Sequence, residues 1–116
     1  MKSWWVPFVH ALAGIRQAVR EERHMKVHFV LGLVVTIASF YFPLSSVERA
    51  ILFLTIGTVL GAEMLNTAFE RTVDLVTKEW HPLAKAAKDI ASGAVLVLAL
   101  TSIVIALCIF VPYLVQ

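Results

Sequence analysis

Long stretches without charged residues alternate with short polar segments along the chain and predict membrane-spanning helices. Residues 27–47 and residues 90–116 contain no Asp, Glu, Lys or Arg. A hydrocarbon core of about 30 Å is crossed by roughly 20 helical residues, so each of these stretches can span a bilayer. Between them, Ser45 to Glu48 have the order Ser-Ser-Val-Glu, a capping-box pattern that predicts the start of another helix.

The middle uncharged stretch is shorter, and this decides where the following acidic residues lie. Residues 50–62 are uncharged over only 13 positions, which is about 20 Å of helix and too short to cross a membrane. The second span must therefore continue through Glu63 to about Glu70. Glu63 is thus expected within the bilayer or at its inner boundary, where charged side chains are costly and mark functional sites.

The segment before the first span has one apolar face. Its apolar residues recur at spacings of four, three and four, which is the periodicity of a helix, and they are Phe8, Leu12, Ile15 and Val19. With tryptophans suited to the headgroup level near its start, the segment is interpreted as an amphipathic helix on the cytoplasmic membrane surface. Packing of the same face against other protein is the alternative.

These patterns predict an all-α integral membrane protein with three transmembrane helices and an N-terminal amphipathic surface helix. Residues 1–116 form a single membrane domain, with the surface helix at about 4–22 and spans at about 27–43, 47–74 and 83–112. Basic residues precede the first span and lie between the second and third. The positive-inside rule therefore places the N-terminus in the cytoplasm and the C-terminus outside.

Composition supports a membrane protein and argues against a soluble one. Hydrophobic residues make up 59% of the chain and charged residues 16%, whereas soluble domains have about 25% charged residues. The net charge of +2 is small, and the basic residues lie beside apolar stretches. Membrane lipids are therefore the expected partner, and no nucleic acid is expected.

Four polar residues lie on one face of the second predicted span, at spacings of three, four and four: Glu63, Asn66, Glu70 and Asp74. At about 100° per residue they fall within roughly 80° of one another, on a ridge about 16 Å long. The ridge contains no Lys or Arg, so a cation from elsewhere has to compensate its charge. The candidates are a divalent metal, Lys88 or basic residues of a neighbouring chain.

Magnesium is the metal favoured by this donor set, because hard carboxylate ligands occur without Cys or paired His. A network of acids with Lys88 that only holds the helices together is the structural alternative. Lys88 could also neutralise a phosphate. His81 is left open between a helix cap, a nucleotide contact and a metal ligand. Phosphate loops and the motifs of soluble kinases and hydrolases are absent from the sequence.

The ridge also carries a family resemblance. Residues 63–70, Glu-Met-Leu-Asn-Thr-Ala-Phe-Glu, followed by Val73 and Asp74, resemble the signature of the small bacterial membrane diacylglycerol kinases. Residues 81–89, His-Pro-Leu-Ala-Lys-Ala-Ala-Lys-Asp, are most similar to the Gram-positive branch, the undecaprenol kinases. The resemblance implies a multi-pass protein of the bacterial inner (plasma) membrane. It also implies a homotrimer with shared active sites that uses MgATP to phosphorylate a lipid alcohol.

The resemblance assigns roles position by position. Glu63 matches the general base and contacts the substrate, Asn66 matches a residue that positions base or substrate, and Lys88 matches a phosphate-neutralising catalytic lysine. Magnesium ligands are implied at Glu22 and Glu70. Further contacts are implied for the lipid at Gly14 and Arg16, and for the nucleotide at His10, Glu22, Glu70, Glu79, Trp80, His81, Lys88 and Asp89. The family commonly has Asn where this chain has His24, so the contact at that position is left open.

The function expected from these observations is transfer of the γ-phosphate of MgATP to undecaprenol, which gives undecaprenyl phosphate for envelope synthesis. A diacylglycerol kinase that makes phosphatidic acid is the alternative within the same class. A small Glu-dependent multidrug-type transporter is more remote, because it needs a fourth span and an acid deep in the bilayer. A catalytically silent assembly subunit would leave the acidic ridge without a purpose.

Overall fold

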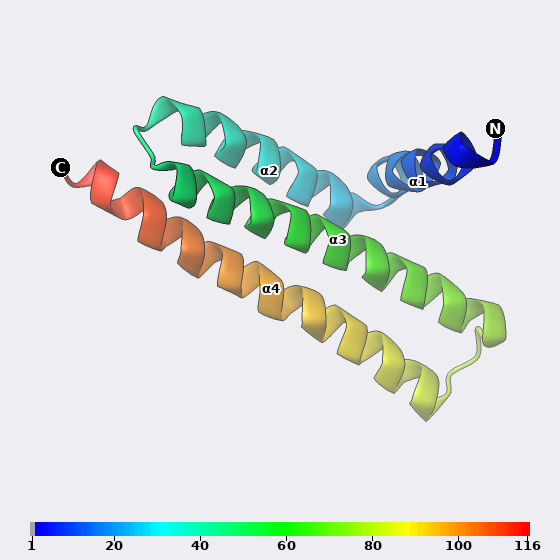
Figure 1. Ribbon diagram of the computed structural model, residues 1–116. Helices are drawn as coiled ribbons and strands as arrows, with labels where there is room; N and C mark the ends of the chain where they lie inside the picture. The colour runs from blue at the N-terminus through cyan, green and yellow to red at the C-terminus, as the bar shows by residue number, and fades with distance from the viewer. Residues whose placement is uncertain (1) are drawn as a thin grey trace.

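The computed structural model describes residues 2–116, with side chains from Ser3 onward. It consists of four helices (Figure 1): α1 (Lys2–Glu21), α2 (Arg23–Tyr41), α3 (Ser46–Val76) and α4 (Pro82–Leu114). Helices α2, α3 and α4 are long and apolar enough to cross a membrane. The predicted all-α fold with three candidate spans and an additional N-terminal helix is therefore confirmed.

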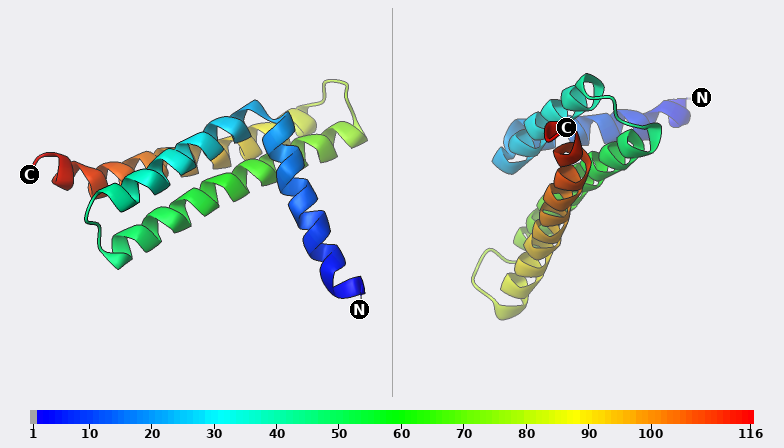
Figure 2. Two further views of the ribbon diagram at one scale, coloured as in Figure 1. Left: turned by 90° about the horizontal axis from the view of Figure 1, so that it is seen from above. Right: turned by 90° about the vertical axis from the view of Figure 1, so that its left-hand side faces the viewer.

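Helices α3 and α4 form a long antiparallel hairpin, and α2 lies against the first part of α3 (Figure 1). Helix α1 is separated from α2 by Glu22 alone and points away from the bundle at a large angle (Figure 2). Because α2 is 19 residues long and α3 is 31, the far part of α3 extends beyond α2. This extension carries the outer part of the acidic ridge, whereas Glu63 lies opposite His28 of α2.

Local sequence explains where the two long helices begin. At the start of α3, Ser45 Oγ accepts a hydrogen bond from the Glu48 backbone N–H at 3.1 Å, and the Glu48 carboxylate accepts one from the Ser45 N–H at 2.9 Å. The predicted capping box is thus formed. At the start of α4, His81 Nδ1 accepts a hydrogen bond from the Leu83 N–H at 3.1 Å, and Pro82 occupies the first turn. His81 therefore caps this helix.

A small polar and apolar cluster ties the helices together at the end remote from α1. The Tyr113 hydroxyl donates a 2.6 Å hydrogen bond to Glu48, which joins the end of α4 to the start of α3. Arg49 Nε donates to the Ser39 carbonyl at 3.0 Å and so fixes the end of α2. The buried apolar residues beneath these contacts are Leu44, Leu52 and Ile109.

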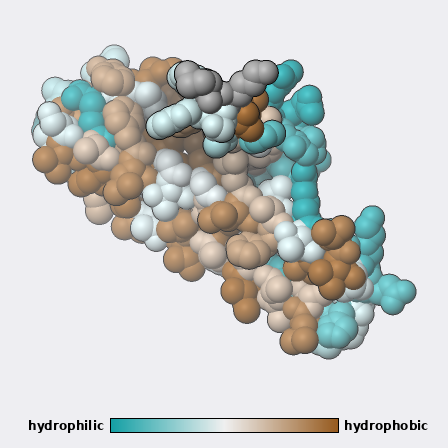
Figure 3. All heavy atoms as spheres, turned by 45° about the vertical axis from the view of Figure 1, so that its right-hand side comes forward, coloured by the Kyte–Doolittle hydropathy of each residue, from teal (hydrophilic) through white to brown (hydrophobic). Residues whose placement is uncertain are grey.

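Most apolar side chains of the three candidate spans face outward. Leu54 and Ile37, for example, are 72% and 70% exposed. In Figure 3 hydrophobic side chains cover much of the visible face of the long helices, and hydrophilic ones gather mainly at its right-hand edge. An exposed apolar surface of this extent suits hydrocarbon or neighbouring subunits rather than water.

Helix α2 approaches α3 closely at Gly32. A Cβ atom at this position would lie 3.0 Å from Cγ2 of Ile56, which is closer than ordinary van der Waals contact. We expect Gly32→Leu to force the two helices apart and to lower the free energy of unfolding by about 1–3 kcal/mol, the usual cost of overpacking. Thermal unfolding in detergent micelles measures this change.

Val30→Leu is the control, because Val30 lies on the same helix and is 57% exposed. It should leave the unfolding temperature unchanged. Equal stability of the wild type and Gly32→Leu would contradict the close packing of α2 on α3.

Candidate active site

The four residues of the acidic ridge lie along α3, and Glu63 is the least accessible to solvent. Glu63 is buried, with 6% of its surface exposed, and Asn66, Glu70 and Asp74 are half-buried. The ridge thus passes from the bundle interior toward the α3–α4 turn, as its helical spacing predicts. Each of its members has a different environment.

Glu63 faces α2. Its Oε2 lies 3.7 Å from Nε2 of His28, and the two side chains are 7% and 20% exposed. This distance is longer than a hydrogen bond but short enough for a strong electrostatic interaction if the imidazole is protonated. A carboxylate removed from water in this way is a candidate general base.

The middle of the ridge contains a polar pair and an unsatisfied acceptor. The Asn66 side-chain amide donates to Glu70 Oε1 at 3.2 Å. The Asn66 Oδ1 atom is buried and has no hydrogen-bond partner among the residues that the structure describes. Buried polar atoms rarely lack partners, so this oxygen is available to accept a hydrogen bond from a bound molecule.

The outer end of the ridge is paired with α4. Lys88 Nζ donates to Asp74 Oδ1 at 2.6 Å. The acid–lysine contact that the sequence left as an alternative is therefore present at Asp74. Lys88 still borders the α3–α4 turn, and its side chain is 39% exposed.

Arg71 connects α3 to the junction between α1 and α2. Its Nη2 donates to Glu21 at 3.0 Å and to Glu22 at 2.9 Å, which clamps the α1–α2 junction against α3. Partial desolvation raises the pKa of the Glu21 carboxyl, but hydrogen bonds from Gln17 and Arg71 outweigh it, and the pKa is lowered overall. Glu22, an expected magnesium ligand, is thus held by an arginine within this chain.

A second group of expected residues meets at the α3–α4 turn. A cavity of about 370 Å³ there brings together five residues assigned to nucleotide or phosphate binding: Glu79, Trp80, His81, Lys88 and Asp89. Lys85 also lines it and donates a hydrogen bond to Asp89. His10, Gly14 and Arg16 are exposed on α1 and do not line this cavity.

Among the described residues, no group of three or more His, Cys, Asp or Glu side chains is arranged to hold a metal ion. Glu70 and Glu22 lie on α3 and at the start of α2, and each has its own partner, Asn66 and Arg71 respectively. Magnesium sites at transferred phosphates need only one or two carboxylates besides phosphate oxygens and water. The hard oxygen donors of these two residues fit that chemistry.

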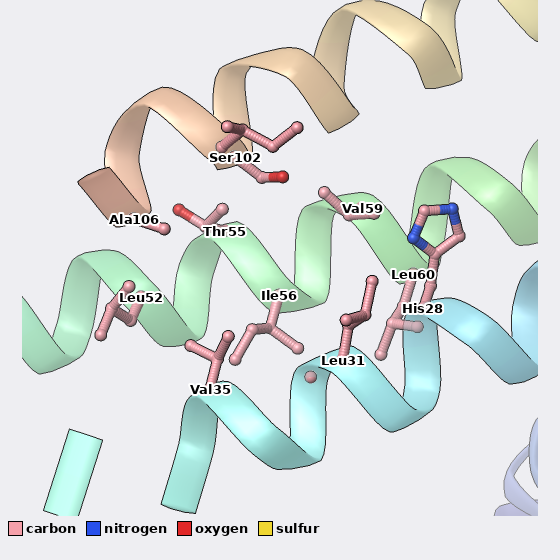
Figure 4. Close-up of a pocket in the computed structure, with 12 residues that line it drawn as sticks. His28, Leu31, Val35, Leu52, Thr55, Ile56, Val59, Leu60, Ser102 and Ala106 are labelled. Atoms are coloured by element: carbon pink, nitrogen blue, oxygen red, sulfur yellow. The ribbon is translucent and has the colours of Figure 1, made fainter. Parts of the chain in front are cut away.

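An apolar pocket of about 220 Å³ lies between α2, α3 and α4 (Figure 4). We call it the inter-helix pocket; twelve residues line it, including His28, Leu31, Val35, Ile56, Val59 and Leu60. The two hydroxyl groups in its wall are engaged locally: Thr55 donates to the Ile51 carbonyl at 2.7 Å, and Ser102 donates to the Ala99 carbonyl at 2.6 Å. The pocket is therefore suited to hydrocarbon.

Two residues of this arrangement, His28 and Arg71, were not expected from the sequence. His28 is the only titratable residue among residues 27–38. Its isolation in an apolar stretch was the sequence feature that could have marked it as a site residue. Arg71 is the first basic residue after the ridge begins, and it follows Glu70 directly. Their partners lie far away along the chain, so spacing alone could not pair them.

The structure thus places a buried carboxylate on α3 between the residues that line an apolar pocket and those that line a polar cavity. A family model described as prokaryotic diacylglycerol kinase matches residues 9–110. The chain is 50% identical to an undecaprenol kinase of Bacillus subtilis, over 97% of this chain and 91% of that protein. It is 39% identical to a diacylglycerol kinase of Synechocystis, over 92% of this chain and 62% of that protein.

A diacylglycerol kinase of Escherichia coli is 32% identical over 78% of this chain and 75% of its own length. The chain therefore belongs to the prokaryotic diacylglycerol kinase family, and it is an ATP-dependent lipid kinase of the membrane. The family resemblance predicted from the ridge is confirmed. The transporter and the silent assembly subunit are set aside.

We expect Arg71→Gln to release the α1–α2 junction from α3 without unfolding the bundle. The side chains of this clamp are between 31% and 46% exposed, and ion pairs between such exposed groups contribute little to stability. Global stability should therefore change little, while backbone hydrogen exchange of residues 18–26 becomes faster. Arg20→Gln is the control, because the ion pair that Arg20 forms within the described part of the chain is with Glu21 of its own helix, at 3.7 Å.

The same clamp should depend on pH. Since the pKa of Glu21 is lowered below its ordinary value of 4.5, the contact persists above that pH and is lost as pH falls through the lowered pKa. Exchange of residues 18–26, corrected for its intrinsic pH dependence, should thus rise only below about pH 4.5. Identical exchange in the wild type and Arg71→Gln at neutral pH would contradict the clamp.

Proposed function

We propose that this enzyme phosphorylates undecaprenol at the cytoplasmic surface of the bacterial inner membrane and produces undecaprenyl phosphate. The observation that carries this proposal is the buried Glu63 carboxylate beside His28, a residue that also lines the inter-helix pocket. The arrangement suits a substrate with a hydrocarbon chain and one terminal hydroxyl. The 50% identity to the Bacillus subtilis undecaprenol kinase supports the same substrate.

The hydrocarbon end of the substrate is proposed to enter the inter-helix pocket. Its volume of about 220 Å³ exceeds that of an apolar cavity of about 150 Å³ that holds a benzene molecule. Several carbons of a branched polyprenyl chain therefore fit. The hydroxyl would then lie at the His28 end, within reach of Glu63.

Glu63 is proposed to act as the general base. Its carboxylate accepts the proton of the lipid hydroxyl as the hydroxyl oxygen attacks the γ-phosphorus of ATP, and the bond from that phosphorus to the bridging oxygen of ADP breaks. Asn66 positions the reacting hydroxyl; its buried Oδ1 atom, which lacks a partner, supports this role.

The nucleotide is proposed to bind at the α3–α4 turn. The cavity there combines an exposed aromatic ring, Trp80, with the ammonium groups of Lys85 and Lys88. Such groups can contact the base and neutralise the phosphates. Glu79, His81 and Asp89 line the same cavity, and His10 would approach from the surface helix of a neighbouring chain.

We propose that Glu70 and Glu22 hold Mg²⁺ together with phosphate oxygens of ATP. A magnesium ion held there would supply positive charge that offsets the charge developing during transfer. Within one chain Glu22 is engaged by Arg71; a site shared between subunits is what the family resemblance implies. Gly14 and Arg16 of α1 are proposed to contact the lipid headgroup region.

The proposed assembly is a homotrimer with a cytoplasmic N-terminus and an external C-terminus. Gly57 and Gly61 on α3 support close contact with another subunit, since among the described residues nothing beyond their immediate neighbours and the nearby backbone of α3 lies within 4 Å of a Cβ built at either position. The orientation rests on the positive-inside rule.

Diacylglycerol is the alternative substrate, because several relatives are diacylglycerol kinases.

The substrate is tested with purified protein, radiolabelled ATP and both lipids presented side by side in mixed micelles. We expect undecaprenol to be phosphorylated with a kcat/KM at least about tenfold above that of diacylglycerol, a difference of about 1.4 kcal/mol.

Glu63→Gln should abolish transfer to either lipid and leave MgATP binding intact. Preference for diacylglycerol, or full activity of Glu63→Gln, would refute the corresponding proposal.

The magnesium ligands are tested by metal titration of the same reaction. We expect Glu22→Gln and Glu70→Gln each to raise the Mg²⁺ concentration for half-maximal rate by about tenfold or more, because each removes one charged ligand. Glu48→Gln is the control, since this acid lies at the opposite end of α3. Unchanged titrations of both test variants would exclude Glu22 and Glu70 as ligands.

A further inference from the structure

His28 lies between the Glu63 carboxylate and the inter-helix pocket. Its Nε2 is 3.7 Å from Glu63 Oε2, and its side chain forms part of the pocket wall. Figure 4 shows the imidazole projecting from α2 toward α3 at one end of the pocket. Only 20% of this side chain is exposed, so its position is defined by packing.

The other basic groups near the acidic ridge form ion pairs with acids other than Glu63. Arg71 binds Glu21 and Glu22, and Lys88 on α4 binds Asp74. Among the described residues, His28 is the basic side chain within 4.0 Å of the Glu63 carboxylate. The next polar residues along the ridge are Asn66 and Glu70, which bond to each other, and the pocket wall around His28 is mostly apolar.

A buried carboxylate is costly unless it has a polar partner. A general base also has to be fixed, because small errors in the position of a reacting group reduce the rate strongly. The present separation of 3.7 Å is slightly longer than a hydrogen bond. Contacts of catalytic groups are often long before the substrate binds and become shorter in the reacting complex.

We propose that His28 is a positioning residue for Glu63, an inference that rests on the proposed function. Its Nε2 holds one carboxylate oxygen, and the other oxygen faces the lipid hydroxyl. Because the imidazole also lines the pocket, hydrocarbon that fills the pocket packs against it and brings it toward Glu63. Occupation of the pocket and alignment of the base are thereby coupled.

The test compares His28→Leu and His28→Gln with Leu31→Ala in the purified full-length enzyme. We expect His28→Leu to lower kcat by about tenfold or more while KM for undecaprenol and MgATP stays within about threefold. His28→Gln retains a side-chain N–H donor and should recover much of kcat. Leu31→Ala alters the apolar pocket wall and should raise KM for undecaprenol with little change in kcat.

A double-variant cycle shows whether His28 acts through Glu63. Glu63→Asp shortens the acid by one methylene and withdraws it from the imidazole. In the Glu63→Asp background, His28→Gln should change kcat by less than about twofold. If the two residues acted independently, the fold-changes in kcat of the two substitutions would instead multiply. Unchanged kcat in both His28 variants, a change confined to KM, or multiplicative effects would overturn the proposal.

Nuclear magnetic resonance of ¹⁵N-histidine-labelled protein supplies a measurement that needs no turnover. Glu63→Gln should shift the His28 ring-nitrogen resonances, and the exposed His24 on the same helix should not respond. An unshifted His28 resonance would overturn the contact. If the wild type phosphorylated neither lipid, the proposed function would fail, while this measurement would still decide whether His28 and Glu63 interact.

Discussion

The removal of the Glu63 carboxylate from water is the constraint on which the rest of this structure depends. A charged group with 6% of its surface exposed is tolerated only where neighbouring polar groups offset the lost hydration. The chain meets this requirement with an imidazole from α2 at 3.7 Å. The cost of burying an acid in an apolar bundle is consistent with the general-base role proposed for Glu63.

The location of this carboxylate also separates two kinds of environment. On one side lies the inter-helix pocket, where even the hydroxyls of Thr55 and Ser102 are bonded to their own helices. On the other side the ridge continues toward a cavity with lysines, acids and an exposed tryptophan. A lipid kinase has to bring a hydrocarbon alcohol and a charged nucleotide together, and the length of α3 beyond α2 makes both environments accessible from one helix.

The contacts that fix the helices and the residues of the candidate site lie at opposite ends of the bundle. The end remote from α1 is fixed by the capping box, by the hydrogen bond from Tyr113 to Glu48, and by Arg49. At the other end the contacts are ion pairs between partly exposed groups, such as that of Lys88 with Asp74, and these contribute less to stability. The chain therefore combines a firmly joined end with an end whose polar contacts can be exchanged for contacts to substrates or to another subunit.

The sequence by itself determined the number of spans, the helix starts at Ser45 and His81, and the acidic ridge, because hydrophobic periodicity, capping and helical spacing are properties of residues close together in the chain. It also contained the family signature. Only the tertiary structure decided that His28 faces Glu63, that Arg71 clamps Glu21 and Glu22, and that Lys88 binds Asp74. Lys88 and Asp74 are 14 positions apart in the chain, and Arg71 and Glu21 are 50 positions apart. Such contacts depend on how the packed helices are aligned, and no local sequence pattern specifies that alignment.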